Sequence, residues 1–175
     1  MEQTDIPAAA LAPKGANQAH LASWPAWRTA LVSGLGGALA ILILAEASDL
    51  AHAALLIAPF GASCVLVFAL PQSPLAQPRN VIGGHLISAA VGLATYLLLG
   101  AHPWSFAIGV GGAIAAMQIT GTVHPPAGAD PIVVILAKAS WPFLLSPVLV
   151  GTLTIVAVGL VYHRWGSRRA YPSGP

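Results

Sequence analysis

Most of this chain consists of long apolar stretches separated by short polar or proline-rich breaks. Six stretches follow Arg28, at about Ala30–Ala45, Ala51–Leu70, Val81–Leu99, Ser105–Thr120, Ile132–Ala137 and Pro147–Tyr162. A helix needs about 20 apolar residues to cross roughly 30 Å of bilayer hydrocarbon. Several stretches approach that length, whereas the fifth, counted from Pro126 to Lys138, would reach only about 20 Å. The pattern predicts an all-α membrane protein of about six helices, two of them broken or partly re-entrant.

The six stretches divide into two similar halves. The tetrapeptide Ala90–Leu93 recurs 67 positions later as Ala157–Leu160, and the same shift aligns Pro59–Ser63 with Pro126–Asp130. Each half holds an odd number of segments, so the second half must enter the membrane from the opposite side. We therefore expect two inverted repeats of three segments each, over about 28–99 and about 104–163, within a transmembrane domain that covers 24–165.

Composition supports the membrane assignment and narrows the partners. Apolar residues make up 57% of the 175 positions and charged residues 7%, whereas a soluble domain carries about a quarter charged residues. The net charge is +2 and the basic residues are scattered, apart from Arg164, Arg168 and Arg169, so we expect the lipid bilayer and no nucleic acid as partner. Residues 1–23 lack the features of a signal peptide and are interpreted as a disordered cytoplasmic tail.

The basic residues also predict the orientation. With six segments and an internal N-terminus, every Lys and Arg except Lys138 falls on the cytoplasmic side, while Glu46 and Asp49 fall in the first outer loop. This distribution predicts a multi-pass protein of the cell (inner) membrane with both termini cytoplasmic, including a tail at 166–175. If the second and fifth segments dip in and return, four full crossings give the same placement.

Two proline- and glycine-containing breaks occupy corresponding places in the two halves, at Ala58–Ser63 and Thr122–Pro131. Proline interrupts a helix and small residues open a new one, and a helix N-terminus in a low-dielectric interior attracts anions. We expect a small inorganic anion between the Gly61 and Gly128 helix ends, and the alternative is that the breaks are proline kinks of packed helices. The candidate substrate-binding residues are Pro59, Phe60, Gly61, Ala62, Ser63, Arg79, Asn80, His124, Ala127, Gly128, Ala129 and Asp130.

Three ionisable residues are candidates for proton coupling. Asp130 is either an N-terminal helix cap, with Ser63 as its neutral counterpart, or a proton acceptor. His124 either fixes the break by hydrogen bonding or carries a proton, and His85 is either a packed polar group or a further carrier. Arg79 is either a cytoplasmic anchor or part of an anion vestibule.

The sequence gives little support for metal binding, a cofactor or hydrolysis. The six histidines and the single Cys64 show no metal-ligand spacing, so neither a metal nor a cofactor is expected. Ser63, His124 and Asp130 could form a hydrolytic set, but no nucleophile elbow accompanies them and no enzyme activity is expected. Glycine-rich faces at Gly34–Gly37 and Gly109–Gly112 allow close packing, either within the protomer or in a homo-oligomer.

Three motifs together resemble the HPP family of integral membrane proteins. They are His124-Pro125-Pro126 followed by Ala-Gly-Ala, the stretch Pro59–Ser63, and the stretch Gln77–His85, and the resemblance covers about Trp24–Trp165. It implies four transmembrane helices, where the apolar pattern gives six segments. It also implies transport of nitrite, since plant plastid relatives are implicated in moving nitrite, and some relatives carry appended soluble regulatory domains.

The sequence therefore favours a membrane transporter or channel for a small inorganic anion, with nitrite or nitrate as the choice that the resemblance implies. One alternative is a proton or cation pathway that uses Asp130 and His124. Another is a membrane scaffold or sensor subunit that transports nothing.

Overall fold

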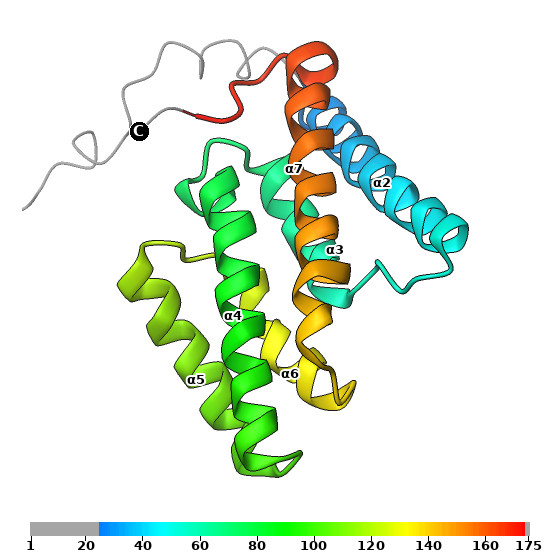
Figure 1. The fold of residues 1–175 in the computed structure, drawn as a ribbon. Coiled ribbons are helices and arrows are strands. Elements are labelled where there is room, and N and C mark those ends of the chain that lie inside the picture. The colour runs from blue at the N-terminus through cyan, green and yellow to red at the C-terminus, as the bar shows by residue number, and fades with distance from the viewer. Residues whose placement is uncertain (1–24, 174–175) are drawn as a thin grey trace, which may run out of the picture.

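The computed structural model describes residues 25–173, and this part of the chain is helical without any strand (Figure 1). Its α-helices are α2 (Ala26–Ala51), α3 (Ala58–Cys64), α4 (Pro78–Leu99), α5 (Pro103–Thr120), α6 (Asp130–Leu136) and α7 (Val150–Tyr162). Shorter 3-10 and π-helical turns cover Val65–Ala69, Pro74–Ala76, Pro125–Ala129, Trp141–Leu144, Leu145–Leu149 and His163–Ser167. The predicted all-α fold is confirmed, whereas the expected tail at 1–23 lies outside the described residues.

The helical segments differ in length as the apolar pattern predicts. Ala26–Ala51, Pro78–Leu99 and Trp141–Ser167 are long and apolar enough to cross a membrane, and α5 has 18 residues. The other two segments, Ala58–Ala69 and Pro125–Leu136, are shorter apolar helices that would each reach only about 18 Å. Two of the six segments are therefore half-length helices within the bundle.

The first connection differs from the expected loop. Glu46 and Asp49 lie inside α2, which continues to Ala51 and ends where His52 takes a left-handed backbone conformation with φ of 48°. The His52 N–H donates to the carbonyl of Asp49 at 3.2 Å, which closes the last turn. The second segment consequently begins at Ala58 rather than near Ala51, because the intervening residues form the connection.

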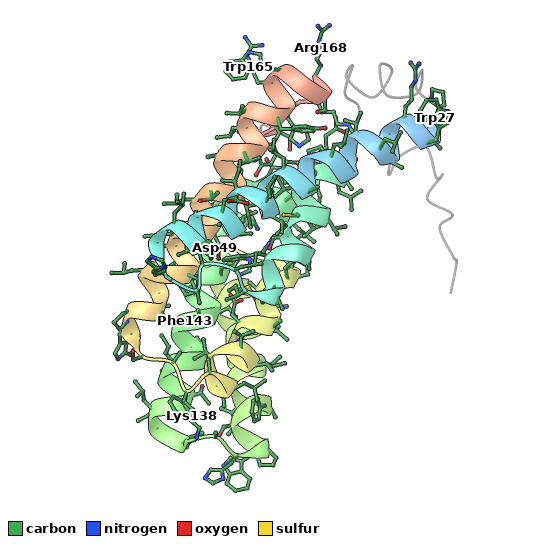
Figure 2. All side chains as sticks on the ribbon, turned by 90° about the vertical axis from the view of Figure 1, so that its right-hand side faces the viewer. Trp27, Asp49, Lys138, Phe143, Trp165 and Arg168 are labelled. Atoms are coloured by element: carbon green, nitrogen blue, oxygen red, sulfur yellow. The ribbon has the colours of Figure 1, made fainter. Side chains whose placement is uncertain are left out.

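Consecutive segments alternate in direction along the bundle. The start of α2 and the end of α7 lie at the same end in Figure 1, and Figure 2 places Trp27, Trp165 and Arg168 there and Lys138 at the opposite end. An even number of segments produces this arrangement. Helices α3 and α6 begin near mid-height and run in opposite directions (Figure 1). An inverted relation between the whole halves stays a prediction.

The core forms where the two half-length helices meet the long ones. The largest fully buried side chains include Phe60, Phe68, Leu93 and Ile155. Many large apolar side chains instead point outward, with exposed fractions of 82% for Leu98 and 85% for Ile119. An apolar exterior is what lipid tails require of a bundle whose polar groups are buried inside.

The segment after α7 is packed rather than free. Arg169 lies against the end of the first half-length helix, where its guanidinium donates to the carbonyls of Phe68 at 3.3 Å and Ala69 at 3.4 Å. His163 donates from Nε2 to the carbonyl of Val67 at 2.8 Å, and the Tyr171 hydroxyl donates to Ala76 at 3.1 Å. These side chains bind carbonyls that a helix C-terminus leaves without backbone partners.

The contact between α4 and α6 yields a prediction about packing. A Cβ placed on Gly92 would lie 2.6 Å from the Cα of Pro131, whereas a Cβ on Gly111 of α5 meets nothing within 4 Å. We expect Gly92→Ala to lower the free energy of unfolding by about 1–3 kcal/mol, because backbone must move to admit the methyl group. Gly111→Ala is the matched control and should leave stability unchanged or raised. Unfolding in detergent solution measures both, and equal stability of the two variants would contradict the observed contact.

A second prediction concerns orientation, where the charge distribution places the end that carries Trp165 in the cytoplasm and the end that carries Lys138 outside. In a Cys64→Ser background, a membrane-impermeant maleimide added to intact cells should label Ser140→Cys. It should label Trp165→Cys only after permeabilisation. The reverse result would mean that the protein is inserted the other way round.

Candidate functional site

Four polar side chains meet where the half-length helices approach α4. Ser63 comes from α3, His85 from α4, His124 from the residue before Pro125, and Asp130 from the start of α6, and all four are fully buried. In a membrane interior such groups are costly unless hydrogen bonds compensate their lost hydration. Their partners therefore determine what the site can do.

The four side chains form one continuous hydrogen-bonded chain. Asp130 Oδ2 lies 2.7 Å from His85 Nδ1, and His85 Nε2 lies 2.8 Å from Ser63 Oγ. Ser63 Oγ also lies 2.9 Å from His124 Nε2, and His124 Nδ1 lies 2.7 Å from the carbonyl oxygen of Leu75. We call Asp130, His85, Ser63 and His124 the polar quartet. A chain of this kind joins its members into one electrostatic unit.

Local sequence explains how each member reaches the quartet. His124 has an extended backbone, with φ of −138° and ψ of 103°, because a residue before proline is disfavoured in the helical region. Pro131 occupies the first turn of α6, where its missing N–H costs nothing, and it follows Asp130 directly. The glycine at Gly84 lets α4 approach closely, since a Cβ there would lie 2.8 Å from the carbonyl oxygen of Thr122.

Further contacts hold the turn that carries His124. Arg79 donates to the carbonyl of Thr120 at 2.9 Å, and Asn80 donates to the carbonyl of Val123 at 2.8 Å. About two helical turns further along α4, the buried Ser88 hydroxyl donates to the carbonyl of Ala127 at 2.6 Å. These bonds explain the polar start of α4, where Arg79 and Asn80 clamp a neighbouring loop.

Aromatic packing fixes the ring at the centre. The Phe60 ring meets His85 edge to face at a centroid distance of 5.4 Å, and the His85 and His124 rings are 5.1 Å apart at 61°. Phe60 and His85 are both fully buried. Because the two rings and Ser63 are enclosed, the histidines cannot turn to water without opening the contact between α3 and α4.

The helix-cap interpretation of Asp130 and Ser63 is wrong. No side-chain cap bond is made at the start of α6, because Asp130 Oδ2 is directed to His85 instead. Ser63 lies within α3 rather than before it, and its hydroxyl is within 3.2 Å of the Pro59 carbonyl in addition to the two histidines. Both side chains therefore serve the quartet and not a helix end.

The bond directions constrain the number of protons in the quartet. The Leu75 carbonyl can only accept, so His124 donates through Nδ1, and an ionised Asp130 likewise accepts from His85 Nδ1. Two neutral histidines in these tautomers each present Nε2 as an acceptor. The single hydroxyl hydrogen of Ser63, for which the Pro59 carbonyl at 3.2 Å also competes, can satisfy at most one of them.

Closing both serine–histidine bonds therefore requires at least one more proton. That proton can make either histidine an imidazolium, or it can reside on Asp130 while His85 Nδ1 accepts. With one added proton, the net charge of the aspartate and the two histidines is zero, whichever of them holds the proton. Loss of this proton would leave a buried negative charge. It would also leave a lone pair of Ser63 Oγ facing a lone pair of one histidine Nε2, at 2.8 Å for His85 or 2.9 Å for His124. The arrangement is suited to hold and release one proton.

The hydrogen-bonded chain of the quartet has a partner at one end and none at the other among the described residues. Its His124 end terminates on the Leu75 carbonyl, which has no proton to pass on. At the other end, Asp130 Oδ1 is buried and has no hydrogen-bond partner among the described residues. Within the described residues, Asp130 Oδ1 is therefore left able to accept a further hydrogen bond.

The structure unites only part of the predicted site. Ser63, His124 and Asp130 converge as candidates, and His85 connects them. Gly61 is exposed and lines an apolar groove of about 420 Å³ with Gly34 and Gly37 of α2. Ala62 is exposed beside it, Pro59 and Ala127 are buried, and Gly128 and Ala129 are half-buried. An anion held between Gly61 and Gly128 stays a prediction.

Sequence reasoning underestimated His85 and did not find Ser88 or the Leu75 carbonyl. One signal was available, because His85 and Ser88 are three residues apart in an apolar helix and share a face. The hydrolytic set considered and rejected from the sequence contained His124, whereas the histidine that binds Asp130 is His85. Among residues 25–173 no group of His, Cys, Asp and Glu side chains could hold a metal ion.

Six apolar helical segments around a buried polar quartet define a polytopic α-helical membrane protein. Residues 22–172 match the transmembrane region of the HPP family, and the chain therefore belongs to that family. This agrees with the resemblance carried by the His-Pro-Pro and Pro-Phe-Gly-Ala-Ser motifs.

Two relatives come from Dictyostelium discoideum. One transmembrane protein is 37% identical over 142 residues, which covers 77% of this chain and 50% of that protein. A second is 36% identical over 125 residues, covering 67% of this chain and 40% of that protein. This chain thus spans half or less of the length of these relatives. No solved structure matches it.

The quartet yields a prediction with a matched control. Ser63→Ala should leave both histidine Nε2 atoms without partners and lower the free energy of unfolding by about 1–3 kcal/mol. Ser105 is also fully buried, but its hydroxyl has no hydrogen-bond partner within residues 25–173, so Ser105→Ala removes the same atom without breaking a hydrogen bond there. Unfolding in detergent should therefore separate the two variants. A Ser63→Ala protein as stable as Ser105→Ala would show that the bonds contribute nothing.

Proposed function

We propose that this protein is a proton-coupled transporter for a small inorganic anion, with nitrite or nitrate as the substrate. The observation that carries the proposal is the fully buried chain from Asp130 through His85 and Ser63 to His124. Intramembrane ionisable residues in such chains are characteristic of proton relays in transporters. The sequence prediction favoured an anion pathway and kept a proton pathway as an alternative. The present proposal combines the two, with the quartet as the proton-binding part.

The proton count gives the coupling a physical basis. A neutral quartet is compatible with burial, whereas a quartet without its extra proton carries an uncompensated negative charge. An anion that comes near Asp130 Oδ1 would be repelled by the deprotonated quartet and tolerated by the protonated one. Proton and anion therefore bind more favourably together than separately, which is the condition for symport.

The substrate class rests on the family resemblance and on the half-length helices. Helices α3 and α6 begin near mid-height of the bundle and run in opposite directions (Figure 1). Paired half-helices at the bilayer midplane are where secondary transporters bind their substrates. Among small inorganic anions, nitrite and nitrate are the choice that the family resemblance implies. We place the protein in the cell (inner) membrane with both termini cytoplasmic.

We propose no hydrolytic activity, although Asp130, His85 and Ser63 are hydrogen-bonded in the same order as the acid, the base and the nucleophile of a catalytic triad. A nucleophilic serine must reach a substrate carbonyl carbon. Ser63 Oγ is fully buried and lies within 3 Å of two histidine nitrogens, 2.8 Å from one and 2.9 Å from the other. The second histidine occupies the position from which a substrate would approach.

The Asp130→Asn variant tests proton transfer while keeping the hydrogen bonds that support the fold. The new amide can donate one N–H to His85 Nδ1, so His85 Nε2 donates to Ser63 and Ser63 donates to His124, and the hydrogen bonds of the quartet are kept with neutral side chains and no ionisable group at position 130. We expect this variant to be as stable as the wild type. In liposomes loaded with a pH-sensitive dye, an inward nitrate gradient should acidify the lumen with the wild-type protein and not with Asp130→Asn.

Controls make the measurement specific. Ser105→Ala should transport like the wild type, and protein-free liposomes report the passive entry of neutral nitrous acid when nitrite replaces nitrate. Anion uptake without acidification in the wild type would refute the coupling. Acidification that persists in Asp130→Asn would refute the role of the quartet, and absence of any flux would favour the scaffold or sensor alternative.

A further inference from the structure

A basic cavity lies at the end of the bundle where the described chain begins and ends. It has a volume of about 520 Å³ and is lined by residues of the last helical turn and the segment after it, namely His163, Arg164, Trp165, Arg168, Arg169 and Ala170. Figure 2 shows Trp165 and Arg168 projecting from this end of the molecule. The cavity is separate from the polar quartet.

The cavity carries three guanidinium groups and no acid. Within the described part of the chain, the one carboxylate found within 4 Å of a basic side chain is Asp130 beside His85, so none of these arginines is neutralised by a carboxylate there. Arg168 takes a left-handed backbone conformation with φ of 54°, which turns the chain at the end of the last helix. Three positive charges within six residues of sequence favour an anionic ligand.

Arg169 adds a second and independent observation. It is 8% exposed, and its Nε is buried without a hydrogen-bond partner among residues 25–173, while Nη1 is engaged by the carbonyls of Phe68 and Ala69. A buried guanidinium donor left unpaired costs free energy, and since Arg169 lines the cavity, we take its unpaired N–H to indicate a missing acceptor there. Guanidinium groups match phosphate oxygens in geometry as well as in charge.

We propose that this cavity binds a phosphate group, with Arg164 and Arg168 at its open side and Arg169 at its floor. Trp165 is 72% exposed beside the arginines, and an exposed tryptophan at a helix end marks the level of lipid headgroups. The phosphate can belong to an anionic phospholipid or to a free phosphate ion. Basic pockets at the cytoplasmic ends of membrane helices bind phospholipid headgroups.

The thermal stability of the purified protein in detergent tests the site. The probes are phosphatidylglycerol, zwitterionic phosphatidylcholine and inorganic phosphate, with chloride at equal ionic strength as the salt control. Phosphatidylglycerol should raise the unfolding temperature of the wild type in a saturable way. Arg164→Gln combined with Arg168→Gln should weaken the apparent affinity by about tenfold or more, since charged hydrogen bonds are lost.

Arg28→Gln is the matched control. Arg28 is exposed at the same end of the molecule and lies 5.3 Å from the Trp27 ring, but it does not line the cavity. It should retain wild-type affinity. A saturable effect of inorganic phosphate equal to that of phosphatidylglycerol would identify free phosphate as the source. Equal weakening by Arg28→Gln, full affinity in the double variant, or no shift with any phosphate would overturn the proposal.

Discussion

The interior of this protein depends on one imidazole ring that makes two hydrogen bonds. His85 binds Asp130 through Nδ1 and Ser63 through Nε2, so a residue of α4 joins the two half-length helices. Neither α3 nor α6, with seven residues each, could remain stable in isolation. The packing of Phe60 against His85 and the close approach of α4 to Pro131 at Gly92 surround these bonds with apolar contact. Polar attraction and steric fit therefore act at the same place.

This arrangement has a cost that also makes it useful. Four fully buried polar side chains are tolerated because each finds a partner, and the bond directions demand a proton beyond those of neutral histidines and an ionised aspartate. A cluster whose favourable state depends on one proton is sensitive to proton supply and to nearby negative charge. The same constraint that holds the helices together would couple proton binding to an anion, as the proposed transport function requires.

The ends of the half-length helices are supported differently. The first ends at carbonyls that His163 and Arg169 bind from the other end of the chain. The polar start of α4 holds the turn before the second, through Arg79 and Asn80. All four of these supporting residues lie within the region that matches the HPP family.

The sequence alone determined the apolar segments, the two breaks and the family, because hydropathy and proline act over a few residues. It also aligned Ser63 with Asp130 at a shift of 67, and these two positions bind the two nitrogens of His85. It did not determine that His85 is the histidine that meets Asp130, nor did it show that Gly61 faces α2. The quartet joins residues 22, 45 and 61 positions apart, and their distances depend on how α3, α4 and α6 pack. Only the tertiary structure could decide these contacts, since side-chain direction at such separations follows from helix rotation and not from local pattern.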